Sequence, residues 1–143
     1  MAQYYVTGAS ATGVSLGKKL QVVEVVIDFS STNLGVGDIV DALEIPADTL
    51  VLNAGIEVIT AAGSGSPTID LGDGSAADTW VTDVAGNAAG HEIGSTPKFY
   101  AAADNLDVLG VTAAFDGKIR VFATMCHLGD SGLQNAITPS TTQ

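Results

Sequence analysis

The feature that most constrains the fold is a two-residue alternation of side chains in stretches rich in β-branched residues. In residues 20–29 one side carries Val23, Val25, Ile27 and Phe29, whereas the opposite side is half polar. Alternation of this kind in β-branched residues is typical of a strand with one buried face. This stretch therefore predicts a β-strand that covers an apolar core.

The alternation recurs between turns rich in Gly, Asp and Asn. Further strands are expected at residues 50–61, 67–71, 78–84, 99–103, 106–111 and 118–128. The strands at residues 67–71 and 78–84 should pair as a hairpin across the turn Gly72-Asp73-Gly74. Residues 38–46 fit either a short helix capped by Asp38 or a strand that Pro46 ends. We favour a strand because its neighbours are strands and the connections are short.

These segments give about eight strands, and strands do not alternate with helices as a parallel α/β sheet would require. The chain has 17 glycines in 143 residues, which is above the usual share and fits many tight turns. We therefore predict an all-β, antiparallel β-sandwich that is jelly-roll-like. Residues 18–129 should form the sandwich, residues 1–17 a flexible N-terminal arm and residues 130–143 a C-terminal tail, because both ends are poor in apolar side chains.

The charge balance limits the classes of partner. Sixteen acidic residues face five basic ones, for a net charge of −11. Nucleic-acid binding depends on Lys and Arg side chains that neutralise phosphates, and anionic membranes repel acidic proteins. No apolar stretch approaches the length of a membrane span, and the N-terminus lacks the basic and apolar regions of a signal peptide. We expect no nucleic-acid partner, no membrane partner and no export.

Residues that carry catalysis are scarce. The chain has two histidines and one cysteine, whereas a zinc site needs three or four ligands in the right geometry. Cys126 lies in an apolar run that fits a small buried side chain, and His91 and His127 fit solvated or core positions. Residues 13–17 match the letters G-x-S-x-G, but they do not join a buried strand to a helix. We therefore expect no enzymatic activity.

The turn after the first hairpin strand is the best candidate metal site, and Asp104 with Asp107 is a weaker one. Asp70, Asp73 and Asp78 place carboxylates around a Gly-bent loop, as a Ca²⁺ ion prefers. Their spacing does not match a calcium-binding EF-hand loop, and an Asp-Gly turn on an acidic surface explains the same residues. We expect no cofactor and keep Ca²⁺ as the alternative. Trp80 is expected in the core rather than on a sugar-binding surface.

The few basic residues are grouped. Lys18 and Lys19 stand where the arm joins the sandwich, and Lys118 and Arg120 share one side of the last strand. Against so acidic a background, these cations can mark a contact with a negatively charged protein surface. They can equally be solvated charges or pair with the neighbouring Asp116.

Three stretches resemble, in the expected order, small β-sandwich proteins in the virions of tailed bacteriophages. Residues 45–58 (IPADTLVLNAGIEV) are similar to their P-A-x-T-x-V…V-E-V stretch. Residues 68–74 (TIDLGDG) resemble their x-I-D-x-G-D-G hairpin, and residues 116–123 (DGKIRVFA) resemble their closing G-x-x-R-V-x-A strand.

The resemblance implies a non-enzymatic virion structural protein, namely a capsid decoration or cement protein. Such proteins form trimers on the outer face of the head, at local three-fold axes, so the implied partners are the major capsid protein and further copies of the chain. The implied location is the capsid surface, after assembly in the host cytoplasm. We expect capsid contact through the arm, residues 3–19, and through a set of aromatic and basic side chains: Tyr4, Tyr5, Lys18, Lys19, Lys118 and Arg120.

Two alternatives stay open. The first is another virion part, such as a head–tail joining, tail or fibre-tip subunit. The second is a calcium- or carbohydrate-binding module, for which Asp70, Asp73, Asp78 and Trp80 would form the site.

Overall fold

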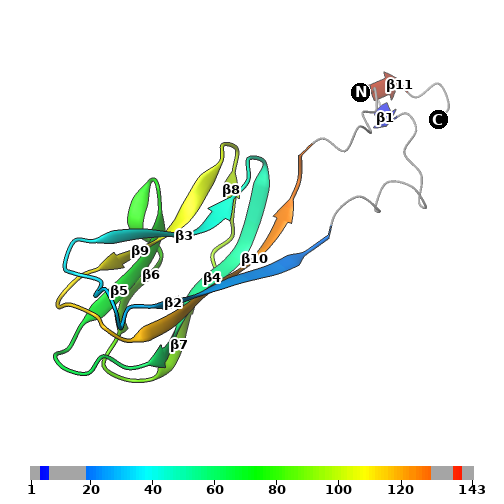
Figure 1. Cartoon of the computed structure of the whole chain (residues 1–143). Helices are drawn as coiled ribbons and strands as arrows, with labels where there is room; N and C mark the ends of the chain where they lie inside the picture. The colour runs from blue at the N-terminus through cyan, green and yellow to red at the C-terminus, as the bar shows by residue number, and fades with distance from the viewer. Residues whose placement is uncertain (1–3, 7–18, 130–136, 140–143) are drawn as a thin grey trace.

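The computed structural model describes residues 4–6, 19–129 and 137–139. Within residues 19–129, nine strands form two antiparallel sheets that lie face to face (Figure 1). The expected all-β sandwich is confirmed. The strands are β2 (Gln21–Asp28), β3 (Ile39–Ile45), β4 (Thr49–Thr60), β5 (Thr68–Asp73), β6 (Ala76–Ala85), β7 (Gly90–Gly94), β8 (Lys98–Tyr100), β9 (Asp104–Gly110) and β10 (Lys118–His127).

The order of the strands is that of a jelly roll. The larger sheet runs β2-β10-β4-β7, with β8 also on β4, and the smaller sheet runs β3-β9-β5-β6. With β7 and β8 counted as one interrupted strand, β2 pairs with β10, β3 with β9, β4 with β7 and β8, and β5 with β6. The chain is thus one long hairpin, which the β10–β4 and β9–β5 pairs roll into two layers. This is the predicted topology.

The core lies between the sheets and consists of the inward side chains of the alternating strands. On β10 the side chains of Ile119, Val121 and Ala123 are fully buried, whereas those between them are half exposed. Two core rings, Phe29 and Phe115, meet edge to face with their centroids 5.8 Å apart. The other large, fully enclosed side chains come from both sheets and from the connection after β2: Leu34, Ile45, Val51, Ile56, Val58, Ile69, Leu71, Leu106 and Val108.

Residues 39–45 form a strand, as favoured over the helix. β3 pairs with β9, and it turns Val40 and Leu43 toward the core on either side of a register shift between Asp41 and Leu43. Pro46 follows the strand directly. Asp48 then takes a φ of 58°, a left-handed conformation that Asp tolerates better than most residues, and the chain turns into β4.

The hairpin differs in detail from the prediction. β5 and β6 do pair, but Asp73 is opposite Ala76, so the turn is Gly74-Ser75 rather than residues 72–74. The extra residues of β6 are taken up by register shifts on either side of Leu71. The prediction placed the turn at the glycines, whereas Gly72 lies inside β5, where the backbone of Ala76 and Ala77 approaches closely.

Two features were not expected from the sequence. β7 is an additional strand at the edge of the larger sheet, where Gly90–Gly94 pair with β4. In addition, β1 (Tyr4–Val6) pairs antiparallel with β11 (Ile137–Pro139), so short segments of the expected arm and tail form a ladder with each other. The remainder of the predicted arm and tail lies outside the described residues.

Candidate functional site

The two sheets present outer faces of different chemistry. On the larger sheet, period-two alternation turns a mixture of apolar, basic and acidic side chains away from the core. We call this the mixed face, and it comprises Val22, Glu24, Val26, Asp28, Asn53, Gly55, Glu57, His91, Ile93, Phe99, Lys118, Arg120, Phe122 and Thr124. On the smaller sheet, the corresponding acidic face comprises Ile39, Asp41, Glu44, Asp70, Asn105, Asp107 and Leu109.

Both basic residues predicted on the last strand lie on the mixed face. Arg120 Nη1 donates to Glu57 Oε2 at 2.8 Å, and Arg120 Nε lies 3.3 Å from Glu24 Oε2 without hydrogen-bond alignment. Lys118 Nζ lies 3.6 Å from Asp28 Oδ2. The partners thus come from the flanking strands β2 and β4. With three carboxylates and two cations paired among themselves, the face is close to neutral.

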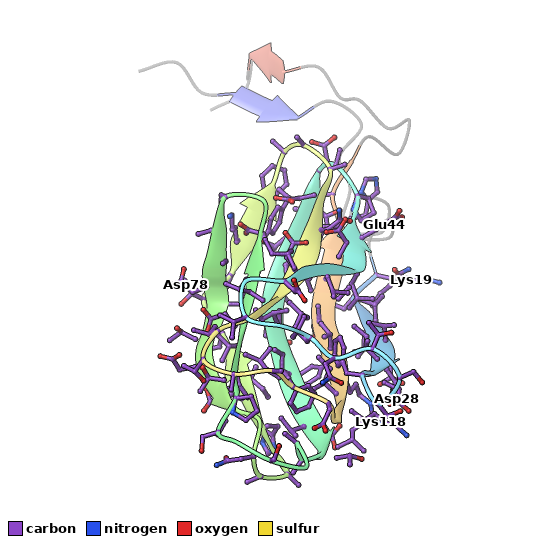
Figure 2. All side chains as sticks on the ribbon, turned by 60° about the vertical axis from the view of Figure 1, so that its left-hand side comes forward. Lys19, Asp28, Glu44, Asp78 and Lys118 are labelled. Atoms are coloured by element: carbon purple, nitrogen blue, oxygen red, sulfur yellow. The ribbon has the colours of Figure 1, made fainter. Side chains whose placement is uncertain are left out.

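The expected alternative partner, Asp116, is used elsewhere. Its Oδ1 accepts a hydrogen bond from the Gly63 backbone N–H at 2.8 Å. Asp116 therefore anchors the loop after β4 and leaves Lys118 to Asp28. Figure 2 shows Asp28 and Lys118 together along the same side of the molecule as Lys19, with Asp78 on the opposite side.

The mixed face also exposes large apolar side chains. Val22 is 75% exposed and Ile93 is 51% exposed, and Val26 and Phe99 are also exposed. The acidic face exposes one such side chain among the described residues, Ile39. Exposed apolar side chains gathered on one face, with polar residues between them, are a feature of protein–protein contacts.

Phe122 lies at the centre of the mixed face, directly over Gly55. A Cβ atom built on Gly55 would stand 2.7 Å from Phe122 Cζ, so the glycine leaves the space that the ring occupies. Around the ring, Val22, Arg120 and His91 help to line a shallow depression. Alternation along β10 puts Phe122 on the same side as Lys118 and Arg120, but the glycine beneath it lies on β4, 67 residues earlier in the chain.

The acidic face brings like charges together. Asp41 of β3 stands directly opposite Asp107 of β9, and one oxygen of Asp107, Oδ1, is buried without a hydrogen-bond partner. Burial first, and then the carboxyl groups of Asp41, Asp104 and Asp73, raise the pKa of Asp107 to about 6. No basic residue of the described chain lies on this face. When ionised, the carboxyl groups of Asp41 and Asp107 therefore repel each other on this face.

Asp73 of the candidate calcium turn is instead the centre of a network that joins the two sheets. Its Oδ2 accepts hydrogen bonds from Lys98 Nζ and from Tyr100 Oη, both at 2.6 Å, and its Oδ1 accepts one from the Ser75 backbone N–H at 2.9 Å. Trp80 Nε1 donates to Tyr100 Oη at 3.0 Å. Burial raises the pKa of the Asp73 carboxyl, but hydrogen bonds from Lys98, Ser75 and Tyr100 outweigh it and hold the pKa well below its usual range.

The other two predicted calcium ligands do not join Asp73. Asp70 Oδ1 accepts the Asp83 backbone N–H at 2.7 Å, and Asp78 is exposed on β6. Within residues 19–129 and the two short terminal strands, no group of three or more His, Cys, Asp or Glu side chains is placed to hold a metal ion. Calcium binding stays a prediction, and the observed hydrogen bonds give Asp70 and Asp73 structural roles.

Three of the four predicted contact residues of the arm, Tyr4, Tyr5 and Lys19, belong to the described residues. Tyr4 and Tyr5 lie in β1, opposite Pro139 and Thr138. Lys18 lies outside the described residues. Lys19 is described and exposed, and it stands two residues before β2.

The remaining residues that the sequence singled out have ordinary structural positions. Trp80 and Cys126 are buried, as expected. His127 is exposed, and its Nδ1 lies 3.5 Å from Thr49 Oγ1. In the described part of the chain, no helix is long and apolar enough to cross a bilayer.

Comparison with known proteins gives structural matches only. No protein-family model matches the chain, and no curated protein matches its sequence. The fold is similar to that of a chain in the acidic stable capsid structure of Helicobacter pylori bacteriophage KHP30, with 10% identity, a TM-score of 0.60, and coverage of 96% of this chain and 98% of that one.

Two further phage capsids contain similar chains. In the cyanophage Pam1 capsid asymmetric unit the identity is 16% and the TM-score 0.62, over 82% of this chain and 91% of that chain. In the capsid of Ralstonia phage GP4 the identity is 14% and the TM-score 0.58, over 78% and 86%. At such low identity the matches establish a shared fold.

Proposed function

We propose that the protein is a non-enzymatic decoration protein that binds the outer face of a phage head as a trimer and stabilises the shell. One observation carries the proposal: the matches to three phage capsid structures span most of both chains. Each matched chain is therefore a small sandwich of similar size, not a fragment of a much larger shell subunit.

The chemistry of the surface supports an outer position. A net charge of −11 would be repelled by packaged DNA on the inside of a head. The same charge on the outside would keep finished particles apart in solution. The sandwich offers one strongly acidic face and one nearly neutral face, which suits a protein with one side toward water and one toward a partner.

The proposed mechanism is linkage between binding and the state of the shell. A protein that binds across several subunits only in their expanded arrangement stabilises that arrangement by mass action. Three chains joined in one trimer would bind more tightly than one, because the second and third contacts become intramolecular. The arm, residues 3–19, with Tyr4, Tyr5, Lys18 and Lys19, is proposed to reach the shell together with Lys118 and Arg120.

The proposal is tested with expanded heads that lack the protein. Purified protein is added, the heads are sedimented, and bound copies are counted; the mass in free solution is measured by light scattering after size exclusion. We expect saturation at hundreds of copies per head, a trimer in solution, and a higher temperature of shell disruption. Saturation at a dozen copies or fewer would instead indicate a head–tail or tail component, and no binding would refute the proposal. If binding is seen, deleting residues 3–19 should weaken it.

A further inference from the structure

We infer that the mixed face is the surface that lies against the shell, and that the acidic face points to the solvent. The inference rests on the proposed decoration function and adds to it the orientation of the sandwich and the side chains in contact. The occupant is a protein surface with apolar side chains and little net charge, supplied by the subunits of the head.

The first argument is the distribution of apolar area. Of the nine large apolar side chains that are exposed in the described residues, four lie on the mixed face, namely Val22, Val26, Ile93 and Phe99, and one, Ile39, lies on the acidic face. Phe122 lies among the four on the mixed face, with its ring packed over Gly55. Apolar and aromatic side chains at the centre of a patch, with charged residues beside them, are the usual composition of a protein contact.

The second argument is electrostatic. Burying a charge without a partner is expensive, but Arg120 and Lys118 already have partners within the face, from Glu57, Glu24 and Asp28. The mixed face can therefore be covered without leaving isolated charges. Covering the acidic face with a surface of little net charge would instead bury Asp41 and Asp107 opposite each other with no cation between them.

The third argument is the position of the arm. The chain enters β2 at Gln21, so the proposed contact segment, residues 3–19, ends three residues before Val22. The proposed contacts of the arm and of the mixed face would thus form one continuous surface. A second copy of the chain is the less suitable occupant, because contact of this face with the same face of a copy closes a two-fold pair rather than a trimer.

The experiment compares charged substitutions on the two faces of the full-length protein. Val22→Glu with Ile93→Glu alters the mixed face, and Ile39→Glu is the matched control, since Ile39 is 60% exposed on the acidic face. All three side chains are exposed, so these changes should affect folding by less than about 0.5 kcal/mol. Unfolding temperature is measured for each variant. If the double variant unfolds early, Val22→Ser with Ile93→Ser replaces it.

The readout is the binding curve on expanded heads, with the mass of each variant from light scattering. We expect the double variant to bind at least about tenfold more weakly, with Ile39→Glu and the parent protein equal. Equal binding by all three would overturn the inference while the decoration function stands. Weaker binding by Ile39→Glu alone would reverse the orientation. Loss of the trimer in the double variant would assign the face to a contact between copies, and failure of the parent protein to bind would refute the function itself.

Discussion

Replacing Asp107 with Asn would remove one of two carboxyl groups that face each other across β3 and β9. Asp107 is surrounded by Asp41 from β3, Asp104 from its own strand and Asp73 from β5, and its Oδ1 is buried without a hydrogen-bond partner. An Asn amide has almost the same shape and carries no charge. Its NH₂ group can also donate to the Asp41 carboxylate.

The magnitude follows from the pKa. Burial and the three neighbouring carboxyl groups raise the pKa of Asp107 from 3.8 to about 6. Between these values the native protein holds a proton that the unfolded chain has released, so stability falls as the pH rises from about 4 to about 6 and then stays low. The shift corresponds to at most about 3 kcal/mol. Because the side chain is partly exposed, solvent screening should reduce this to about 1–2 kcal/mol.

The assay is denaturant unfolding followed by the fluorescence of Trp80, the single tryptophan of the chain and a core residue. At about pH 7.5 we expect Asp107→Asn to be more stable than the parent protein by about 1–2 kcal/mol, and the difference should vanish near pH 4. Asp78→Asn, on an exposed carboxyl, is the control and should change little at either pH. A gain for Asp107→Asn that is equal at both pH values, or a loss at pH 7.5, would refute the reasoning.

Three further predictions concern stability. Asp73→Ala should lower the free energy of unfolding by about 3 kcal/mol, because it removes the acceptor of the buried Tyr100 hydroxyl and of the Lys98 ammonium group. A loss below about 1 kcal/mol in denaturant unfolding would contradict a central role. Gly55→Ala should destabilise by about 1–3 kcal/mol, since the new methyl group meets the backbone carbonyl oxygen of Glu92 as well as the Phe122 ring. Gly90→Ala is its control, because nothing lies within 4 Å of that Cβ. Arg120→Gln should cost less than about 1 kcal/mol, as expected for exposed ion pairs, and added salt should shrink the difference.

The strands that the sequence predicts well are those with one buried and one open side. In β2 and β10 the alternation of Val and Ile with polar residues follows directly from the pleat of a strand that covers a core. The same alternation does not predict β7, because the residues Gly-His-Glu-Ile-Gly of this edge strand are mostly exposed on both sides. Its strand conformation depends on pairing with β4, and local composition does not encode that pairing.

For the candidate site, the sequence predicts which way side chains point but not which side chains they contact. That Lys118, Arg120 and Phe122 share the outer side of β10 can be read from the alternation alone. Their partners cannot, because Glu24 and Glu57 are separated from Arg120 by 96 and 63 residues and meet it only through the register of β10 with β2 and β4. For Asp73 the local sequence is misleading. Its position between two glycines indicates a solvent-exposed turn, whereas its side chain is buried and bonded to Lys98 and Tyr100.

The pairing of Arg120 and Lys118 within the face changes what these residues can do at an interface. As free cations they would attract an acidic partner over a distance, and their contribution would weaken with salt. Held by Glu57, Glu24 and Asp28, they contribute little net field and instead let the surrounding apolar side chains be covered without an unpaired charge. In the proposed docking, the favourable contribution is therefore the burial of apolar area, about 25 cal/mol per Å² before the costs of association are subtracted. The repulsion between Asp41 and Asp107 would then favour the orientation that leaves the opposite sheet in water.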